Sequence, residues 1–235
     1  MDDKAKDLRR ALRQSPWFGF DLDDTLHEFR KASGAATTAT LTRISNAHQI
    51  EISCLKSAYS KILSQGTSGA FSDGKTSHQY RRERFSALLA SFSLTATANS
   101  PEFLAGLLDT YEHTLTSILE LKPDVLDLFV QLRRMGKKIA RTIEALGLSD
   151  KIDFLATTNR FGVAKVDGLF PRVLAHLDIQ ATDMVYIGDS QERDMVPAME
   201  CGMRTIHYAE NENFDPTAVP AKFDTLAKIA HLVSE

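Results

Sequence analysis

The chain has 235 residues, a net charge of −3 and 43% hydrophobic residues. These values suit one large domain, or a core with a smaller second domain, and argue against a nucleic-acid-binding protein. No apolar run approaches the ~20 residues that a membrane span requires, and residues 1–14 lack the apolar segment of a secretion signal. The two cysteines, Cys54 and Cys201, suit ordinary reduced thiols, so we expect a cytoplasmic protein with no membrane partner.

The first informative segment is an apolar run that ends in acidic residues. Residues 7–12 predict a short surface helix, and residues 17–23 predict a strand whose end carries Asp21 and Asp23. Because side chains alternate along a strand, these two aspartates share one side of it. Neighbouring carboxylates repel each other, and burial strengthens that repulsion, so a proton or a cation is needed. A hard cation such as Mg²⁺ suits these oxygen ligands.

The middle of the chain, residues 28–121, has a helical pattern without a good strand candidate. Ser100-Pro101-Glu102 combines a capping residue, a proline at the first position and an early acid, which together indicate a helix start. We expect helices over residues 38–48, 52–64, 77–92 and from 101 onward, with a loop over 66–74. This pattern predicts a small helical domain inserted after the acidic strand.

From Pro123 onward, helical and strand patterns alternate. Strands are expected near residues 139–140, 152–157, 184–188 and 204–208, with helices over 125–135, 169–177, 195–201 and 226–233. Such alternation predicts an α/β fold, a Rossmann-like parallel sheet with helices on both faces. Ligands of these sheets bind beyond the carboxyl ends of the strands, which is where Asp21 and Asp23 fall.

Two later segments add charged residues to the same edge. Gly188-Asp189 ends an apolar strand, and Asp194 follows five residues after Asp189. Lys165 lies between a strand and the helix at 169–177 and supplies a cation. A turn with a helix cap and a solvated lysine are the simpler interpretations of these segments.

Taken together, these patterns resemble the motifs of the haloacid dehalogenase-like (HAD) superfamily. The string Asp21-Leu22-Asp23-Asp24-Thr25-Leu26 resembles its first motif, and Gly188-Asp189 with Asp194 resembles its fourth. Lys165 matches the third-motif lysine, although Val166 stands where the family most often has proline. The resemblance implies a core of residues 1–27 and 122–235 and a type-1 helical cap of residues 28–121.

The resemblance also implies a function. It makes the chain a Mg²⁺-dependent phosphatase of a small soluble phosphate monoester, with Asp21 as nucleophile, Asp23 as acid and base, and Lys165 as balancing cation. The implied metal site comprises Asp21, Asp23 through its carbonyl, Asp189 and Asp194. Dehalogenases of the superfamily lack an acid at the Asp23 position. A sugar phosphomutase and a phospho-ligand-binding pseudoenzyme remain alternatives.

One expected motif is not visible. The family has a Thr or Ser at the end of the strand after Gly136, yet roughly ten residues, about one helix with its loop, are absent between Ala140 and Arg141. We favour a segment missing from the sequence as written; Thr142 as a substitute, or a deletion, are the alternatives. In the inserted domain, Arg81, Arg82 and Arg84 form either a substrate-selecting surface or a solvated helix face.

Overall fold

The computed structural model describes residues 3–66, 75–141 and 152–234. The chain divides into two compact units, which are described separately. Residues 1–28 and 120–235 form the core unit, and residues 29–119 form the inserted unit. Across the described ranges, no helix combines the length and the apolar character needed to cross a bilayer.

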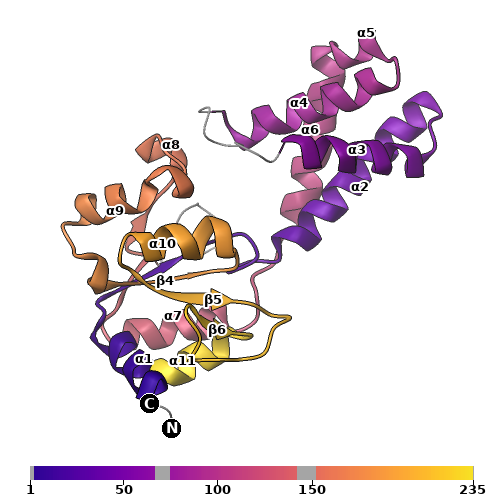
Figure 1. The fold of residues 1–235 in the computed structure, drawn as a ribbon. Helices are drawn as coiled ribbons and strands as arrows, with labels where there is room; N and C mark the ends of the chain where they lie inside the picture. Colours follow the sequence, from indigo (N-terminus) through magenta and orange to yellow (C-terminus); the bar gives the residue numbers. More distant parts are fainter. Residues whose placement is uncertain (1–2, 67–74, 142–151, 235) are drawn as a thin grey trace. The chain divides into compact units, whose positions relative to one another are not determined.

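The core unit is built on a parallel sheet, part of which is labelled in Figure 1. Its strand order is β3-β2-β1-β4-β5-β6. The strands are β1 (Trp17–Phe20), β2 (Lys138–Arg141), β3 (Phe154–Leu155), β4 (Met184–Gly188), β5 (Arg204–Tyr208) and β6 (Ala221–Phe223). This sheet confirms the predicted α/β fold. The three-residue strand β6 was not predicted, because it has no apolar run of its own.

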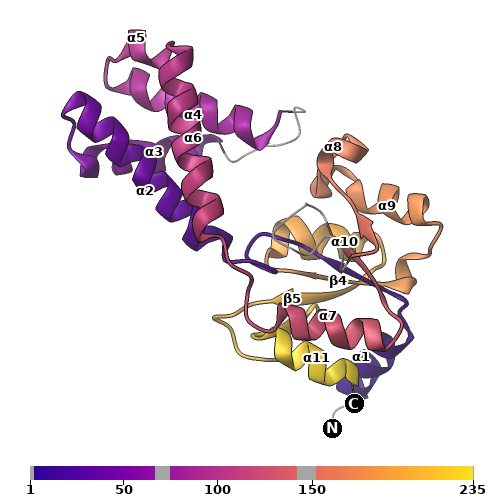
Figure 2. The same cartoon turned by 180° about the vertical axis from the view of Figure 1, so that it is seen from behind.

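Helices cover both faces of the sheet (Figures 1 and 2). One face packs on α1 (Asp3–Gln14), α7 (Val125–Arg134) and α11 (Leu226–Ser234); the other packs on α9 (Leu169–Leu177) and α10 (Val196–Glu200), with the short α8 (Thr158–Phe161) beyond. Phe18, Phe20 and Leu22 all lie in the hydrophobic cluster on the face covered by α1, α7 and α11, as strand alternation requires. The helix predicted over residues 7–12 lies within α1, which exposes Asp7 and Arg10 and buries Leu12 against the sheet.

The strand order places β1 beside β4 at the centre of the sheet. From β1 the chain adds strands toward β3, and from β4 it adds them toward β6, so the direction of winding reverses between these two strands. Phe20 pairs with Ile187, and the Asp21 amide donates to the Ile187 carbonyl at 2.8 Å. In parallel α/β sheets this reversal point is where ligands bind.

Strand β2 runs through Ala140 and Arg141, the point at which the family pattern is interrupted. Ala140 pairs with Gly19 and with Phe154, and Arg141 pairs with Phe20. The strand is therefore regular up to Arg141. Thr142 and the rest of the expected second motif fall within residues 142–151, outside the described residues.

The inserted unit consists of helices around its own hydrophobic cluster, which includes Phe85, Leu107 and Tyr111. Its helices are α2 (Phe29–His48), α3 (Ile52–Gly66), α4 (Ser77–Ser91), α5 (Thr95–Ala98) and α6 (Pro101–Ile118). The expected start of α6 is confirmed: the Ser100 hydroxyl accepts a hydrogen bond from the Phe103 amide at 3.3 Å. Most of the predicted loop at 66–74 lies outside the described residues.

The two connections to the inserted unit pair with each other inside the core unit. The Glu28 amide donates to the Glu120 carbonyl at 3.0 Å, and the Lys122 amide donates to the Leu26 carbonyl at 2.9 Å. The buried Lys122 ammonium then donates to Glu28 at 3.1 Å and to Glu210 at 2.8 Å. We call this paired segment, residues 26–28 with 120–122, the linker ribbon.

Candidate active site

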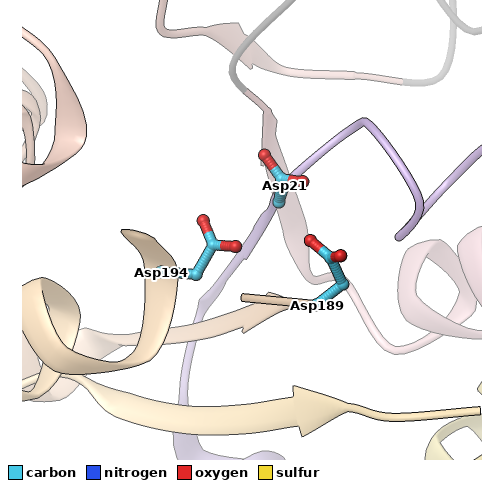
Figure 3. Close-up of side chains that lie close together, drawn as sticks. All are labelled: Asp21, Asp189 and Asp194. Atoms are coloured by element: carbon cyan, nitrogen blue, oxygen red, sulfur yellow. The ribbon is translucent and has the colours of Figure 1, made fainter. Parts of the chain in front are cut away.

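Three carboxylates converge at the carboxyl ends of β1 and β4 (Figure 3). Asp21 follows β1, Asp189 follows β4, and Asp194 lies in η4 (Gln191–Met195), a short π-helical segment. Each offers an oxygen atom, and these three atoms lie within 4.8 Å of one another. The structure thus brings together three of the four residues that the sequence suggested as metal ligands.

The loop after β4 is shaped to hold Asp194 against the strand end. A Cβ atom on Gly188 would lie 2.7 Å from Cβ of Asp194, so only glycine leaves room there. The Ser190 amide donates to Asp194 Oδ2 at 3.1 Å, and the Ser190 hydroxyl accepts from the Arg193 amide at 3.2 Å. These bonds cap η4 and fix the Asp194 side chain.

Lys165, at the start of η2 (Lys165–Asp167), is the cation of this cluster. Its ammonium donates to Asp21 Oδ1 in a very close contact and to Asp194 Oδ1 at 2.6 Å. Its side chain is only 18% exposed. Although burial acts to lower it, the pKa of Lys165 is raised well above its usual value by adjacent Tyr186, Asp21 and Asp194. The lysine is therefore charged and offsets the repulsion between two of the carboxylates.

Asp23 lies beside this cluster without belonging to it. Burial, and next the nearby Asp21 carboxylate, raise the pKa of Asp23 to about 7. Its side chain keeps 41% of its surface exposed, and His27 Nδ1 lies 3.8 Å from its Oδ1. A partly exposed carboxyl group with a pKa near neutrality can both give and take a proton, which is the behaviour expected of a general acid and base. His27 itself is buried.

Two further residues contact the cluster and were not singled out from the sequence. The Tyr186 hydroxyl donates to Asp194 Oδ1 at 3.4 Å, and His207 Nε2 lies 2.9 Å from the Asp189 carbonyl oxygen. Both sit in predicted strands, β4 and β5. A polar side chain inside a buried strand was the available signal, but its partner depends on the strand order.

The donor set fits a hard divalent cation. Mg²⁺ binds oxygen ligands at 2.0–2.1 Å, so two ligands of one ion lie up to about 4.2 Å apart. The 4.8 Å limit of the cluster is close to that span, and a small side-chain movement on binding would close the difference. Three clustered carboxylates with one lysine carry a net negative charge, and a cation would offset it.

Comparisons with known proteins agree with this geometry. The model of the family described as haloacid dehalogenase-like hydrolase matches residues 19–208. The ribulose-1,5-bisphosphate 5-phosphatase of Halopiger xanaduensis is 26% identical, over 92% of this chain and 98% of that protein. The glyceraldehyde 3-phosphate phosphatase of Methanocaldococcus jannaschii is 31% identical, but over only 47% of this chain and 49% of that protein.

Solved structures share the fold over nearly the whole chain. A magnesium-bound hydrolase of the same type from Bacillus subtilis has a TM-score of 0.70 at 21% identity, covering 94% of this chain and 100% of that one. The 2-haloacid dehalogenase of Pseudomonas syringae has a TM-score of 0.69 at 22% identity, covering 94% and 98%. At these identities the likeness concerns the fold alone.

Proposed function

Since the chain belongs to the haloacid dehalogenase-like hydrolase family, we propose that it is a Mg²⁺-dependent phosphatase of small phosphate monoesters. The observation that carries the proposal is the arrangement around Asp21. This carboxylate lies at the switch point of the sheet, beside two further carboxylates and a half-buried lysine, and Asp23, with its pKa raised to about 7, follows two residues later. The two phosphatases among its relatives support the same reaction.

The proposed reaction has two steps. A carboxylate oxygen of Asp21 attacks phosphorus, the bond from phosphorus to the ester oxygen breaks, and the departing alcohol takes the proton of Asp23. Asp23, now a carboxylate, accepts a proton from water as that water attacks the aspartyl-phosphate. The bond between phosphorus and Asp21 then breaks, which releases phosphate and restores both side chains.

In this scheme, the metal and Lys165 act through their positive charges. Asp21, Asp189 and Asp194 would hold Mg²⁺, together with the Asp23 carbonyl that the family resemblance implies. When bound, Mg²⁺ supplies positive charge that offsets the repulsion between the Asp21 carboxylate and the phosphate. Lys165 neutralises part of the same charge and holds Asp21 and Asp194 in place. The inserted unit is proposed as the substrate-selecting cap, and a small sugar phosphate as the substrate class.

Dehalogenation is the competing activity, because dehalogenases share this fold. A halide leaves without a proton, whereas an alkoxide requires one, so a protonated Asp23 serves only the phosphate ester reaction. Asp23, with its pKa raised to about 7, therefore favours phosphoryl chemistry. A sugar phosphomutase would use the same residues but transfer the phosphoryl group to a second sugar.

The test is phosphate release by the purified protein from p-nitrophenyl phosphate, ribulose 1,5-bisphosphate and glyceraldehyde 3-phosphate, with Mg²⁺ or with EDTA. We expect release that requires Mg²⁺ and is abolished by Asp21→Asn, which removes the nucleophile. Asp23→Asn should slow phosphate release from the sugar phosphates by about 10²–10⁴-fold. With p-nitrophenyl phosphate, the first burst of nitrophenolate should be slowed far less, because nitrophenolate leaves without protonation, whereas later turnovers should stay slow because hydrolysis of the aspartyl-phosphate still lacks its base.

Three results would separate the alternatives. Undiminished release by Asp21→Asn, or in EDTA, contradicts the proposal directly. Transfer between sugars without release of phosphate identifies a mutase. Binding of phosphate esters without turnover of any substrate identifies a pseudoenzyme.

A further inference from the structure

We propose that His207 is a positioning residue that holds the Asp189 end of the metal site in place, an inference that rests on the Mg²⁺-dependent function proposed above. His207 lies in β5, and its side chain is nearly buried, with 8% of the residue exposed. Its Nε2 atom lies 2.9 Å from the carbonyl oxygen of Asp189, a residue of the carboxylate cluster.

The chemistry of this contact fixes the state of the imidazole. A carbonyl oxygen can only accept a hydrogen bond, so Nε2 must carry the proton and donate it. The other ring nitrogen, Nδ1, is buried and has no hydrogen-bond partner among the described residues. Within the described part of the chain, the ring therefore makes a single side-chain hydrogen bond, and that bond ends on the Asp189 backbone.

The location explains why such a bond is needed. The register pairs Gly188 of β4 with His207 of β5, and this is the last pair between the two strands. Asp189 lies just beyond this last pair, where the chain leaves β4 and enters the loop that carries Asp194. The hydrogen bond from the His207 side chain to the Asp189 carbonyl extends the pairing between β4 and β5 by one residue.

The loop is held at its other end by different groups. Asp194 is fixed by the Ser190 amide and by its close packing on Gly188. His207 supplies the matching restraint on the Asp189 backbone. Backbone freedom at Asp189 would swing its carboxylate relative to Asp21, so loss of the histidine should weaken metal binding rather than abolish folding.

Mg²⁺ affinity, measured by isothermal titration calorimetry on the purified full chain, tests the proposal. Groups that orient metal ligands typically change metal affinity by 10–100-fold when removed, and we expect His207→Leu to weaken Mg²⁺ binding by about tenfold. His207→Gln should stay within about threefold, because the Gln amide nitrogen can reach the position of Nε2. His207→Asn, whose shorter amide cannot reach it, should resemble His207→Leu. The exposed His113, mutated to Leu, is the control and should bind as wild type.

Kinetics and hydrogen exchange separate positioning from general structural damage. In His207→Leu, the Mg²⁺ concentration needed for half-maximal phosphate release should rise, while the rate at saturating Mg²⁺ recovers. In the metal-free protein, the Ser190 amide should exchange faster. Wild-type Mg²⁺ affinity in both His207→Leu and His207→Asn overturns the inference, as does equal weakening in the Leu, Asn and Gln variants. If His207→Leu does not fold, the Mg²⁺ affinities of His207→Asn and His207→Gln are compared instead, and equal affinities in these two variants overturn the inference. Wild-type protein that binds no Mg²⁺ overturns the proposed function as well.

Discussion

At the scale of single residues, the charge balance of the site controls its chemistry. Asp21, Asp189 and Asp194 place three carboxylates together, and the Lys165 ammonium donates to two of them. Burial also raises the pKa of Asp194, while Lys165 acts in the opposite direction. Protonation and the proposed metal binding should therefore be linked, and the linkage can be measured through stability.

Asp23 should make the metal-free protein less stable as pH rises from about 4 to about 7. Its pKa is raised from 3.8 to about 7 in the folded state, so over this range the unfolded chain releases a proton that the folded chain retains. The contribution of Asp23 to stability is thus greatest below pH 4 and falls until pH 7, after which Asp23 adds no further change. Urea unfolding in EDTA, with wild type compared with Asp23→Asn, measures this.

Two comparisons control that experiment. The difference in stability between wild type and Asp23→Asn isolates Asp23 from the other titrating groups. Saturating Mg²⁺ should make this difference nearly independent of pH, because a nearby cation lowers the pKa of Asp23. A difference that is constant from pH 4 to pH 8 would show that the carboxyl titrates normally. The partial exposure of the side chain means that water screens the effect, so its direction is the prediction.

Gly188→Ala should reduce phosphate release by at least tenfold and destabilise the protein by about 1–3 kcal/mol. The added Cβ would lie 2.7 Å from Asp194, which must then move away from the cluster. Gly34→Ala is the matched control, because nothing lies within 4 Å of a Cβ at this exposed position in α2. The control should keep full activity and gain roughly 0.5–1 kcal/mol of helix stability. Equal activity in both variants would contradict the packing argument.

The residues of the site were predictable to different degrees. Asp21 and Asp189 directly follow apolar strands, so strand alternation and the geometry of parallel sheets were enough to place them together. His207 and Tyr186 act through contacts to neighbouring segments, and those contacts depend on strand register. A sequence without strand order cannot supply that information.

At the scale of elements, periodic helices were predicted well and short segments were not. The helices α6, α7 and α9 begin where a cap or the start of an amphipathic pattern placed them. By contrast, β6, α8 and α5 have three or four residues each, too few to produce a periodic signal. Helix α2 begins at Phe29, nine residues before its predicted start, because the alanines and threonines of its first turns show little contrast between faces.

The linker ribbon is held by one buried side chain, that of Lys122. Lys122→Met should lower the free energy of unfolding of the core unit by about 1–3 kcal/mol, since it removes both ion pairs of a buried ammonium. The loss should stay below the 3–5 kcal/mol of fully buried pairs, because the Glu28 and Glu210 side chains keep 31% and 42% of their surface exposed.

Lys228→Met is the matched control for the ribbon. Lys228 pairs with Asp224 at 2.8 Å, but its side chain is 44% exposed. Exposed pairs of this kind contribute roughly 0–1 kcal/mol. Urea denaturation curves of the two variants provide the comparison, and equal losses would show that burial of Lys122 adds nothing.

At the scale of the whole molecule, the candidate metal site belongs entirely to the core unit. Mg²⁺ should therefore slow amide hydrogen exchange in β1, β4 and the 188–195 loop, and leave α3 unchanged at the same protein concentration. At 100 times the dissociation constant, binding adds about 2.7 kcal/mol of stability. Exchange measured by mass spectrometry with and without Mg²⁺ tests this, with Asp189→Asn as the control in which the effect should disappear. Equal protection in α3 would contradict it.

The division into two units, each with its own hydrophobic cluster, parallels the insertion suggested by the helical middle of the sequence. The predicted position of that insertion rests on the sharp change between helical and alternating patterns near residues 28 and 121. The second-motif region was not readable, because the family pattern is interrupted after Ala140. An intact mass that matches 26.1 kDa would exclude a segment missing from the sequence as written.

The linker ribbon also bears on how such proteins diversify. Its two chain segments run side by side, with the Glu28 amide 3.0 Å from the Glu120 carbonyl. An insertion whose ends already meet imposes almost no constraint on what is inserted, since any segment with adjacent termini can replace residues 29–119. Recombination at this point could exchange one inserted unit for another while the carboxylate cluster stays intact. The same point is a practical junction for building chimaeric enzymes.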